Sequence, residues 1–186
     1  DVSWLEKRID AENLAAHKKI SDLLKLMENT VKTVRRISTE LRPSVLDDLG
    51  LVVAMDLQLK EFEKRAGIST KLIAPKREPL LPAAVKNGMF RIFQESLTNV
   101  ARHSGAQKVI VTFEKMDEKI VLTIEDNGTG FDEKEAAAKR TLGVLGMKER
   151  AIVMGGEYLI SGKPGKGTTI VVSVPLNKKI EAPVKK

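Results

Sequence analysis

The sequence contains no cysteine in its 186 residues, which excludes disulfide bonds and thiolate metal sites. It also lacks any apolar run of about 18 residues, so it predicts no membrane-spanning helix and no membrane contact by this chain. No signal peptide is recognisable. Aromatic residues make up only 4% of the chain and the lysines are scattered, so the formal net charge of +7 does not indicate a nucleic-acid partner. We therefore expect a cytoplasmic protein that binds no nucleic acid.

The remaining composition is that of a chain with a buried core. Hydrophobic residues make up 42% and charged residues 31% of the sequence, which suits one or two small domains. Because Asp1 resembles a cut edge rather than a natural start, we expect further segments upstream, including any membrane anchor of the parent protein.

A heptad pattern runs from residue 20 to residue 41. Its apolar positions form two sets with one polar interruption: Ile20, Met27, Val34 and Leu41, then Leu23, Thr30 and Ile37. Such a seam predicts a long helix that packs against partners in a four-helix bundle or, alternatively, within its own chain. Asp10 or Asn13 is expected to cap this helix. Pro43 is expected to end it, and the residues after Pro43 to form a hinge.

The rest of the chain alternates helices with strands. One helix is predicted between Gly50 and Gly67, with an apolar stripe of Val52, Met55, Leu59, Phe62 and Ala66. Two more are predicted over residues 82–102 and 144–154, and strands over residues 68–74, 108–115, 119–125, 157–161 and 168–175. Residues 132–142 are expected to form a mobile lid, and residues 179–186 a disordered tail.

The most informative segment follows the strand predicted over residues 119–125. Asp126 stands where this strand ends, and Gly128 and Gly130 follow it in a tight bend. The carboxylate can accept a hydrogen bond from an amino group such as that of adenine, and the glycines allow a ligand to approach the backbone. Taken alone, the same pattern also fits an ordinary surface loop or a calcium loop.

A second polar set lies on the helix predicted over residues 82–102. Glu95, Asn99 and His103 are four residues apart and therefore share one helical face. The amide oxygen of Asn99 is a hard ligand suited to Mg²⁺, which keeps several waters and bridges phosphates. The alternative is that Asn99 is a solvent-facing polar residue, and that Glu95 forms a helix salt bridge with Arg91.

Four segments occur in a characteristic order: residues 90–104, 126–131, 141–151 and 165–169. They resemble the N, G1 and G2 boxes and the terminal Gly-Thr motif of histidine-kinase ATP-binding domains, a group related to the gyrase and mismatch-repair ATPases. Residues 42–51 resemble sensor kinases of the nitrate-sensor and DesK type. The resemblance implies an α+β fold, a two-layer α/β sandwich of the Bergerat type over residues 47–178. It also implies a partial dimerisation region over residues 1–46, so that the parent protein is a homodimer.

The resemblance implies a histidine kinase that uses ATP and Mg²⁺. The γ-phosphoryl group would pass to a histidine on the dimerisation helix, and then to an aspartate on a response-regulator receiver domain. Asp126 would read adenine with Gly128 and Gly130 making room, and Asn99 would hold the metal. Arg102 and His103 would face the phosphates, and Glu95 would act in catalysis by ordering the metal's water or the acceptor imidazole.

The two remaining motifs would complete the nucleotide site. The second glycine-rich box would hold phosphate oxygens through backbone amides at a helix start; its residues are Gly143, Val144, Leu145, Gly146 and Met147. Thr168 would assist adenine recognition, or alternatively would simply begin a strand.

The sequence lacks a recognisable phosphoacceptor. His17 is followed by Lys18 and Lys19 rather than by the acid expected after an acceptor histidine. We expect His17 to be a surface helix residue, and the chain alone not to phosphorylate itself. The alternatives are a hydrolase of the gyrase or mismatch-repair class, an anti-sigma serine kinase, and a non-enzymatic nucleotide-binding interaction module.

Overall fold

The computed structural model describes residue 13 and residues 16–27, 44–131 and 142–176. The chain divides into two compact units, Asp1–Ser44 and Val45–Lys186. In the first unit, residues 16–27 form a helix. Asn13 caps it, because its Oδ1 accepts a hydrogen bond from the Ala16 N–H at 3.1 Å, which confirms one of the two predicted caps. His17 lies on this helix and is partly exposed, whereas the heptad positions after Met27 lie outside the described residues.

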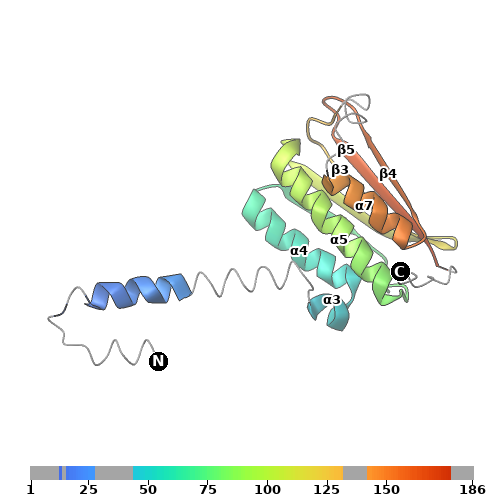
Figure 1. Cartoon of the computed structure of the whole chain (residues 1–186). Helices are drawn as coiled ribbons and strands as arrows, with labels where there is room; N and C mark the ends of the chain where they lie inside the picture. The colour runs from blue at the N-terminus through green and yellow to red at the C-terminus, as the bar shows by residue number, and fades with distance from the viewer. Residues whose placement is uncertain (1–12, 14–15, 28–43, 132–141, 177–186) are drawn as a thin grey trace. The chain divides into compact units, whose positions relative to one another are not determined.

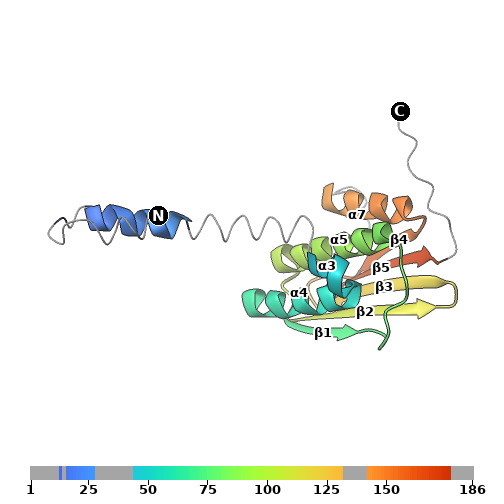
Figure 2. The ribbon, with the colours of Figure 1, turned by 90° about the horizontal axis from the view of Figure 1, so that it is seen from below.

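The second unit is built on a five-stranded sheet with the order β1-β2-β3-β5-β4. The strands are β1 Ser69–Ile73, β2 Lys108–Met116, β3 Lys119–Asp126, β4 Glu157–Gly162 and β5 Thr168–Pro175. β1 is parallel to β2, and the other pairs are antiparallel. Helices cover one face of this sheet (Figures 1 and 2), so the predicted two-layer arrangement is confirmed.

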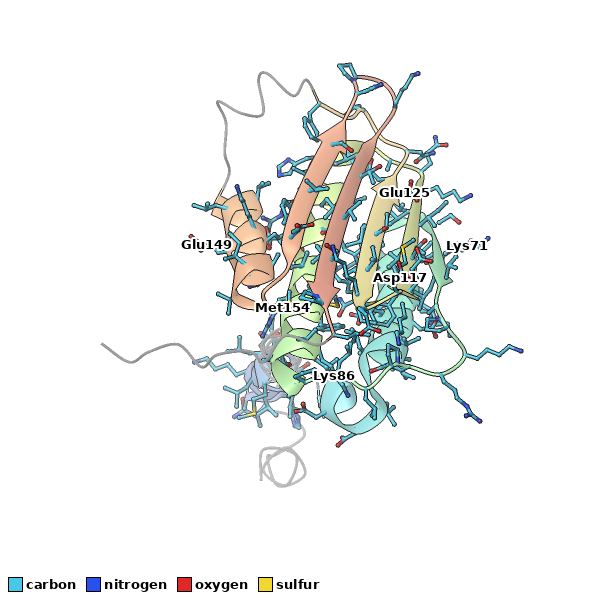
Figure 3. All side chains as sticks on the ribbon, turned by 90° about the vertical axis from the view of Figure 1, so that its right-hand side faces the viewer. Lys71, Lys86, Asp117, Glu125, Glu149 and Met154 are labelled. Carbon is cyan, nitrogen blue, oxygen red and sulfur yellow. The ribbon has the colours of Figure 1, made fainter. Side chains whose placement is uncertain are left out.

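The core lies between the sheet and the helices. Alternate residues of the central strands point toward it, because successive side chains of a strand face opposite sides. The buried strand residues are Val109, Val111 and Phe113, then Ile120, Leu122 and Ile124, then Ile170, Val172 and Val174. Charged side chains project from the outer surfaces, for example Glu149 on the outside of α7 and Lys71 on β1 (Figure 3). Among the described residues, no helix is long and apolar enough to cross a membrane.

Helix α4, Leu51–Ala66, packs its apolar stripe on the core. Met55, Leu59 and Phe62 are buried as predicted, but Leu51 and Ala54 complete the buried set, and Ala66 is exposed. The helix ends at Gly67 as predicted, and this glycine has a left-handed φ of 69°. The prediction of a hinge after Pro43 is wrong for residues 44–49. They form a short helix, α3 Ser44–Leu49, whose Leu46 is buried in the core.

The two helices that carry the predicted nucleotide motifs differ in extent from the prediction. The helix expected over residues 82–102 is α5, Ala83–Asn99, followed by a π-helical turn, η1, over Val100–Ser104. This turn ends at Gly105, which has a left-handed φ of 61°. The next helix, α7 Leu142–Val153, begins two residues before the predicted start. The expected lid lies outside the described residues except for Leu142, which begins α7, and the expected tail lies outside them entirely.

The start of α4 is capped from a distant part of the chain. Glu78, in the connection between β1 and α5, accepts a hydrogen bond from the Val52 N–H at 2.8 Å through Oε2. The other carboxylate oxygen lies 3.8 Å from Nζ of Lys86, near the start of α5 (Figure 3). Gly50 precedes the helix at a φ of 90°, and a Cβ at this position would stand 2.8 Å from the Glu78 carboxylate. Glu78 therefore joins the start of α4 to the start of α5.

We expect Glu78→Ala to lower the free energy of unfolding by about 1–2 kcal/mol, because it leaves a helix N–H without its cap. Urea unfolding of the chain measures this. Glu61→Ala is the matched control, since Glu61 is an exposed residue of α4, the helix that Glu78 caps, and it should change the value by no more than about 0.5 kcal/mol. Equal effects of the two substitutions would contradict the capping role.

Candidate functional site

A cavity of about 360 Å³ lies where α5 and η1 meet the ends of β3, β4 and β5 and the start of α7. Nine of the residues predicted from the sequence line it: Glu95, Asn99, Arg102, His103, Asp126, Gly130, Gly143, Val144 and Thr168. These residues come from segments more than 70 positions apart in the chain. The structure therefore brings the four sequence motifs to one site.

Asp126 is held by its own loop. Its Oδ1 accepts a hydrogen bond from the Gly128 N–H at 2.8 Å, which is a short Asx turn. The next side chain, Asn127, holds the loop to β2, because its Oδ1 accepts hydrogen bonds from the backbone N–H groups of Gln107 and Lys108, at 2.9 and 2.8 Å. One carboxylate oxygen of Asp126 thus stays available to a ligand while the loop is tied to the start of β2.

Close backbone approaches fix the loop from both sides. A Cβ on Gly128 would overlap the carbonyl of Ser104, and a Cβ on Gly130 would overlap that of Lys163. Gly167, before β5, lies so close to the Asp126 carbonyl that a side chain there would also overlap. Only glycine fits these positions, and at Gly130 and Gly167 the φ angles of 65° and 80° impose the same requirement. The glycines therefore set where Asp126 stands.

The polar wall of the cavity comes from α5 and η1. Glu95 and Asn99 are partly buried on α5, and Arg102 and His103 are exposed on η1. On the opposite side of α5, Phe93 and Leu97 are buried in the core. The apolar face of α5 thus packs on the core. The polar face of α5 and η1 brings a carboxylate, an amide and two basic side chains to the cavity.

Helix α7 meets α5 at short range. A Cβ on Gly143 would overlap the Glu95 carboxylate, so this glycine in the first turn of α7 lets the acid lie beside the helix. Further along, the buried hydroxyl of Ser96 contacts the Met147 sulfur at 3.5 Å and donates to the Ile92 carbonyl at 2.8 Å. Small side chains at these points allow α7 to pack closely on α5.

Four predicted site residues lie outside the cavity lining. Gly128 is buried within the Asp126 loop against the Ser104 carbonyl, and Met147 is fully buried in the core. Gly146 instead lines a separate groove between α5 and α7, and the side chain of Leu145 is exposed. Met147 has no exposed side-chain surface for a ligand, so its side chain serves the packing of α7.

The structure adds cavity residues that the sequence reasoning did not select: Ser96, Val100, Ser104, Ile124, Phe131, Ile160 and Ile170. Most are apolar and give the cavity a hydrophobic end next to Asp126. Ile124 and Ile170 lie on strand faces that point toward the core, and alternation along a strand does not distinguish core residues from cavity residues. Ser104 has a positional role, because its carbonyl accepts the Thr129 N–H at 2.8 Å and its hydroxyl accepts the Ala106 N–H at 2.9 Å.

Tyr158 lies on β4, two residues before the cavity residue Ile160. Its hydroxyl is buried and has no hydrogen-bond partner among the described residues. Burial raises the pKa of this phenol from 10.0 to about 12. Tyr158 is therefore protonated at neutral pH and does not serve as a base for the neighbouring cavity.

Comparison with known proteins decides the family. Residues 84–178, slightly more than half of the chain, match the histidine kinase-, DNA gyrase B-, and HSP90-like ATPases. The chain belongs to this family. Its matched region contains every residue of the predicted site and all of the cavity lining. The chain therefore contains an ATP-binding domain of the histidine-kinase type, as the resemblance of the four motifs predicts.

Individual relatives are kinases. The chain is 38% identical over 161 residues to the signal transduction histidine-protein kinase/phosphatase DegS of Brevibacillus brevis, covering 87% of this chain and 42% of that protein. It is 37% identical over 151 residues to the sensor histidine kinase MctS of Rhizobium johnstonii, covering 80% and 32%. The chain thus spans less than half the length of these relatives.

Solved structures support the fold. The histidine kinase domain of the blue-light activated histidine kinase from Erythrobacter litoralis EL346 superposes with a TM-score of 0.64 at 17% sequence identity. This similarity covers 94% of the present chain and 90% of that domain. Acinetobacter baumannii histidine kinase AdeS gives a TM-score of 0.58 at 14% identity, covering 95% of this chain and 92% of that one.

Gly167 and Gly165 allow a direct test of the close approach beside Asp126. Both have left-handed φ angles, but a Cβ on Gly165 meets nothing within 4 Å, whereas one on Gly167 overlaps the Asp126 carbonyl. We expect Gly165→Ala to cost only backbone strain, about 1–2 kcal/mol. Gly167→Ala should cost more and also weaken adenine-nucleotide binding, because it moves Asp126. Urea unfolding and calorimetric titration with ADP measure both effects, and equal losses in the two variants would contradict this account.

Proposed function

We propose that this chain is the ATP-binding catalytic part of a sensor histidine kinase. The observation that carries the proposal is the polarity of a single cavity. Asp126 and the apolar residues Ile124 and Ile170 form one part, which suits a base with an exocyclic amine. Glu95, Asn99 and the basic residues of η1 form the other, which suits phosphates and their metal.

The metal in this proposal is Mg²⁺, held jointly by the protein and the nucleotide. Within the described residues, no group of three His, Cys, Asp or Glu side chains is placed to hold a metal ion by itself. The Asn99 amide would supply one hard oxygen ligand, and the Glu95 carboxylate, one helical turn away, would order the metal's waters, which fits an ion that keeps its waters and binds phosphate oxygens. When bound, Mg²⁺ would offset the charge of the phosphates.

The remaining predicted residues complete the proposed site. Arg102 and His103 would contact phosphate oxygens, and Gly143 and Val144 would present backbone N–H groups at the start of α7. Leu145, Gly146 and Met147 would position that helix, and Thr168 would contact the adenine ring from the start of β5. Gly128 and Gly130 would keep Asp126 in place.

The proposed reaction transfers the γ-phosphoryl group of ATP to histidine. An imidazole nitrogen of the acceptor attacks the γ-phosphorus while the bond to the ADP oxygen breaks, so catalysis consists mainly of positioning and charge stabilisation. Glu95 would orient the acceptor imidazole or the metal's water. The acceptor would be a histidine of a dimerisation helix in a homodimer, and a receiver-domain aspartate of a response regulator would take the group next. We propose that His17 is not this acceptor, because two lysines follow it.

Asp126→Asn tests the base contact without disturbing the loop. The amide oxygen can still accept the hydrogen bond from the Gly128 N–H. The other carboxylate oxygen, however, is replaced by an NH₂ group, which is a donor and would face the adenine amine, a second donor. A mispaired polar group costs about 1–3 kcal/mol, so ADP affinity should fall roughly tenfold to over a hundredfold. Calorimetric titration measures this. Asp117→Asn, at the exposed β2–β3 turn with φ of 51°, is the control that should bind normally. Unchanged affinity in Asp126→Asn would refute the assignment.

Asn99→Ala tests the metal contact. Removing the amide oxygen should abolish most of the gain in ATP affinity that Mg²⁺ provides, while adenosine binding stays nearly unchanged. Titrations of ATP with and without Mg²⁺ measure the gain in affinity that the metal provides, and titration of adenosine measures the binding of the base and ribose alone. Asn87→Ala is the matched control, because Asn87 lies on the same helix outside the cavity lining. If adenosine and ATP affinities fell together, Asn99 would be a structural residue instead.

A further inference from the structure

The loop after β3 contains a chemically labile dipeptide. Asn127 and Gly128 form one of the two Asn-Gly pairs in the chain, and the other is Asn87-Gly88. Glycine after asparagine favours deamidation, because a residue without a side chain lets its backbone nitrogen reach the asparagine amide. The Asn87-Gly88 pair lies inside α5, where backbone N–H groups donate along the helix. The Asn127-Gly128 pair lies in a loop, so other contacts decide its reactivity.

The nucleophile in deamidation of Asn127 is the backbone nitrogen of Gly128, and Asp126 restrains it. The Gly128 N–H donates a hydrogen bond of 2.8 Å to Oδ1 of Asp126. To attack, this nitrogen must lose its hydrogen, which removes a hydrogen bond to a charged acceptor. The resulting nitrogen anion would also lie beside the Asp126 carboxylate, and like charges at this distance repel. The Asp126 side chain therefore raises the barrier to the reaction.

The electrophile, the side-chain carbonyl of Asn127, is polarised by its contacts. Its Oδ1 accepts hydrogen bonds from the backbone N–H groups of Gln107 and Lys108, at 2.9 and 2.8 Å. Two backbone N–H groups on one carbonyl oxygen stabilise the oxyanion that forms when a nucleophile adds to the carbon. The loop thus combines an activated carbonyl with a restrained nucleophile, and the hydrogen bond to Asp126 is the contact that restrains it.

We propose that Asn127 is a deamidation site controlled by the hydrogen bond between Gly128 and Asp126. When this hydrogen bond opens, a bond forms between the Gly128 nitrogen and Cγ of Asn127. The bond between Cγ and Nδ2 breaks, and the side-chain nitrogen leaves as ammonia with the hydrogen that Gly128 lost. Water then hydrolyses the cyclic imide at either carbonyl, which gives aspartate or isoaspartate at position 127.

The two products differ in their effect on the loop. Aspartate keeps a side-chain oxygen that accepts the two N–H groups of β2 and the residue before it. Isoaspartate adds a methylene group to the main chain next to Gly128, where even a Cβ would overlap the Ser104 carbonyl. The loop has no room for a longer backbone, so isoaspartate displaces Asp126 and ends ADP binding. This loss of binding rests on the proposed function, whereas the deamidation itself does not.

The experiment incubates the full 186-residue chain in mildly alkaline buffer and follows both Asn-Gly pairs by peptide mass spectrometry. Asp126→Ala removes the acceptor, so deamidation at Asn127 should accelerate at least about tenfold, the effect of losing a hydrogen bond to a charged group. Asp126→Asn is the matched control, because its amide oxygen still accepts the Gly128 N–H but carries no charge. Its rate should lie between those of the original chain and of Asp126→Ala.

Asn87 reports on unfolding in the same samples. A substitution that unfolds the chain accelerates deamidation at both pairs, whereas loss of the Asp126 contact affects Asn127 alone. If Asp126→Ala does unfold the chain, the original chain supplies the second test. Its Gly128 amide should be protected from hydrogen exchange in NMR spectra, and Asn127 should deamidate more slowly in buffer than in a denaturing concentration of urea.

The inference is overturned if folded Asp126→Ala and Asp126→Asn deamidate at Asn127 at the same rate, or if Asn127 stays intact in Asp126→Ala. It is also overturned if Asn127 of the original chain reacts as fast in buffer as in urea. Calorimetric titration with ADP then compares the fresh chain with the isoaspartate form. A chain that deamidates as expected but never binds ADP contradicts the proposed function and leaves the deamidation site in place.

Discussion

The packing of α5 on the sheet is the constraint on which the rest of the second unit depends. This helix lies beside both α4 and α7, and its apolar face contributes Met89, Ile92 and Phe93 to the core. Burial of these side chains fixes the rotation of the helix about its own axis. That rotation in turn directs Glu95 and Asn99 into the cavity, so the same hydrophobic contacts that stabilise the fold also orient the polar wall of the site.

The cavity depends equally on places where side chains are missing. Gly143 admits the Glu95 carboxylate beside α7, and Gly88 admits the Met154 side chain between α5 and α7. Gly128, Gly130 and Gly167 bring three backbone segments together around Asp126. The hydrogen bonds that Asn127 Oδ1 and the Ser104 carbonyl accept then tie the Asp126 loop to its neighbours. A carboxylate held in this way needs little reordering when a ligand arrives, which favours affinity.

Membership in the histidine kinase-, DNA gyrase B-, and HSP90-like ATPase family is consistent with this arrangement, because the matched residues contain the complete cavity. Kinase function requires more than the cavity. Phosphoryl transfer needs an acceptor within reach of the nucleotide, and the chain covers less than half of the length of its kinase relatives. The ATP-binding domain therefore supplies the donor side of the reaction, and the geometry of the acceptor side belongs to the dimerisation region in the proposal.

The sequence by itself determined the local elements and the identity of the motifs. Alternating apolar residues indicated the strand that became β3, the glycine after α4 marked the end of that helix, and the order of four short segments indicated an ATP site. Only the tertiary structure decided which motif residues face the cavity. Met147 and Gly128 belong to the same motifs as Gly143 and Asp126, yet packing places both away from the lining. The π-helical turn after Asn99 and the capping of α4 by Glu78 also escaped prediction. Each depends on contacts between residues distant in the chain, or on a backbone register that such contacts select, and periodicity along the sequence carries no information about either.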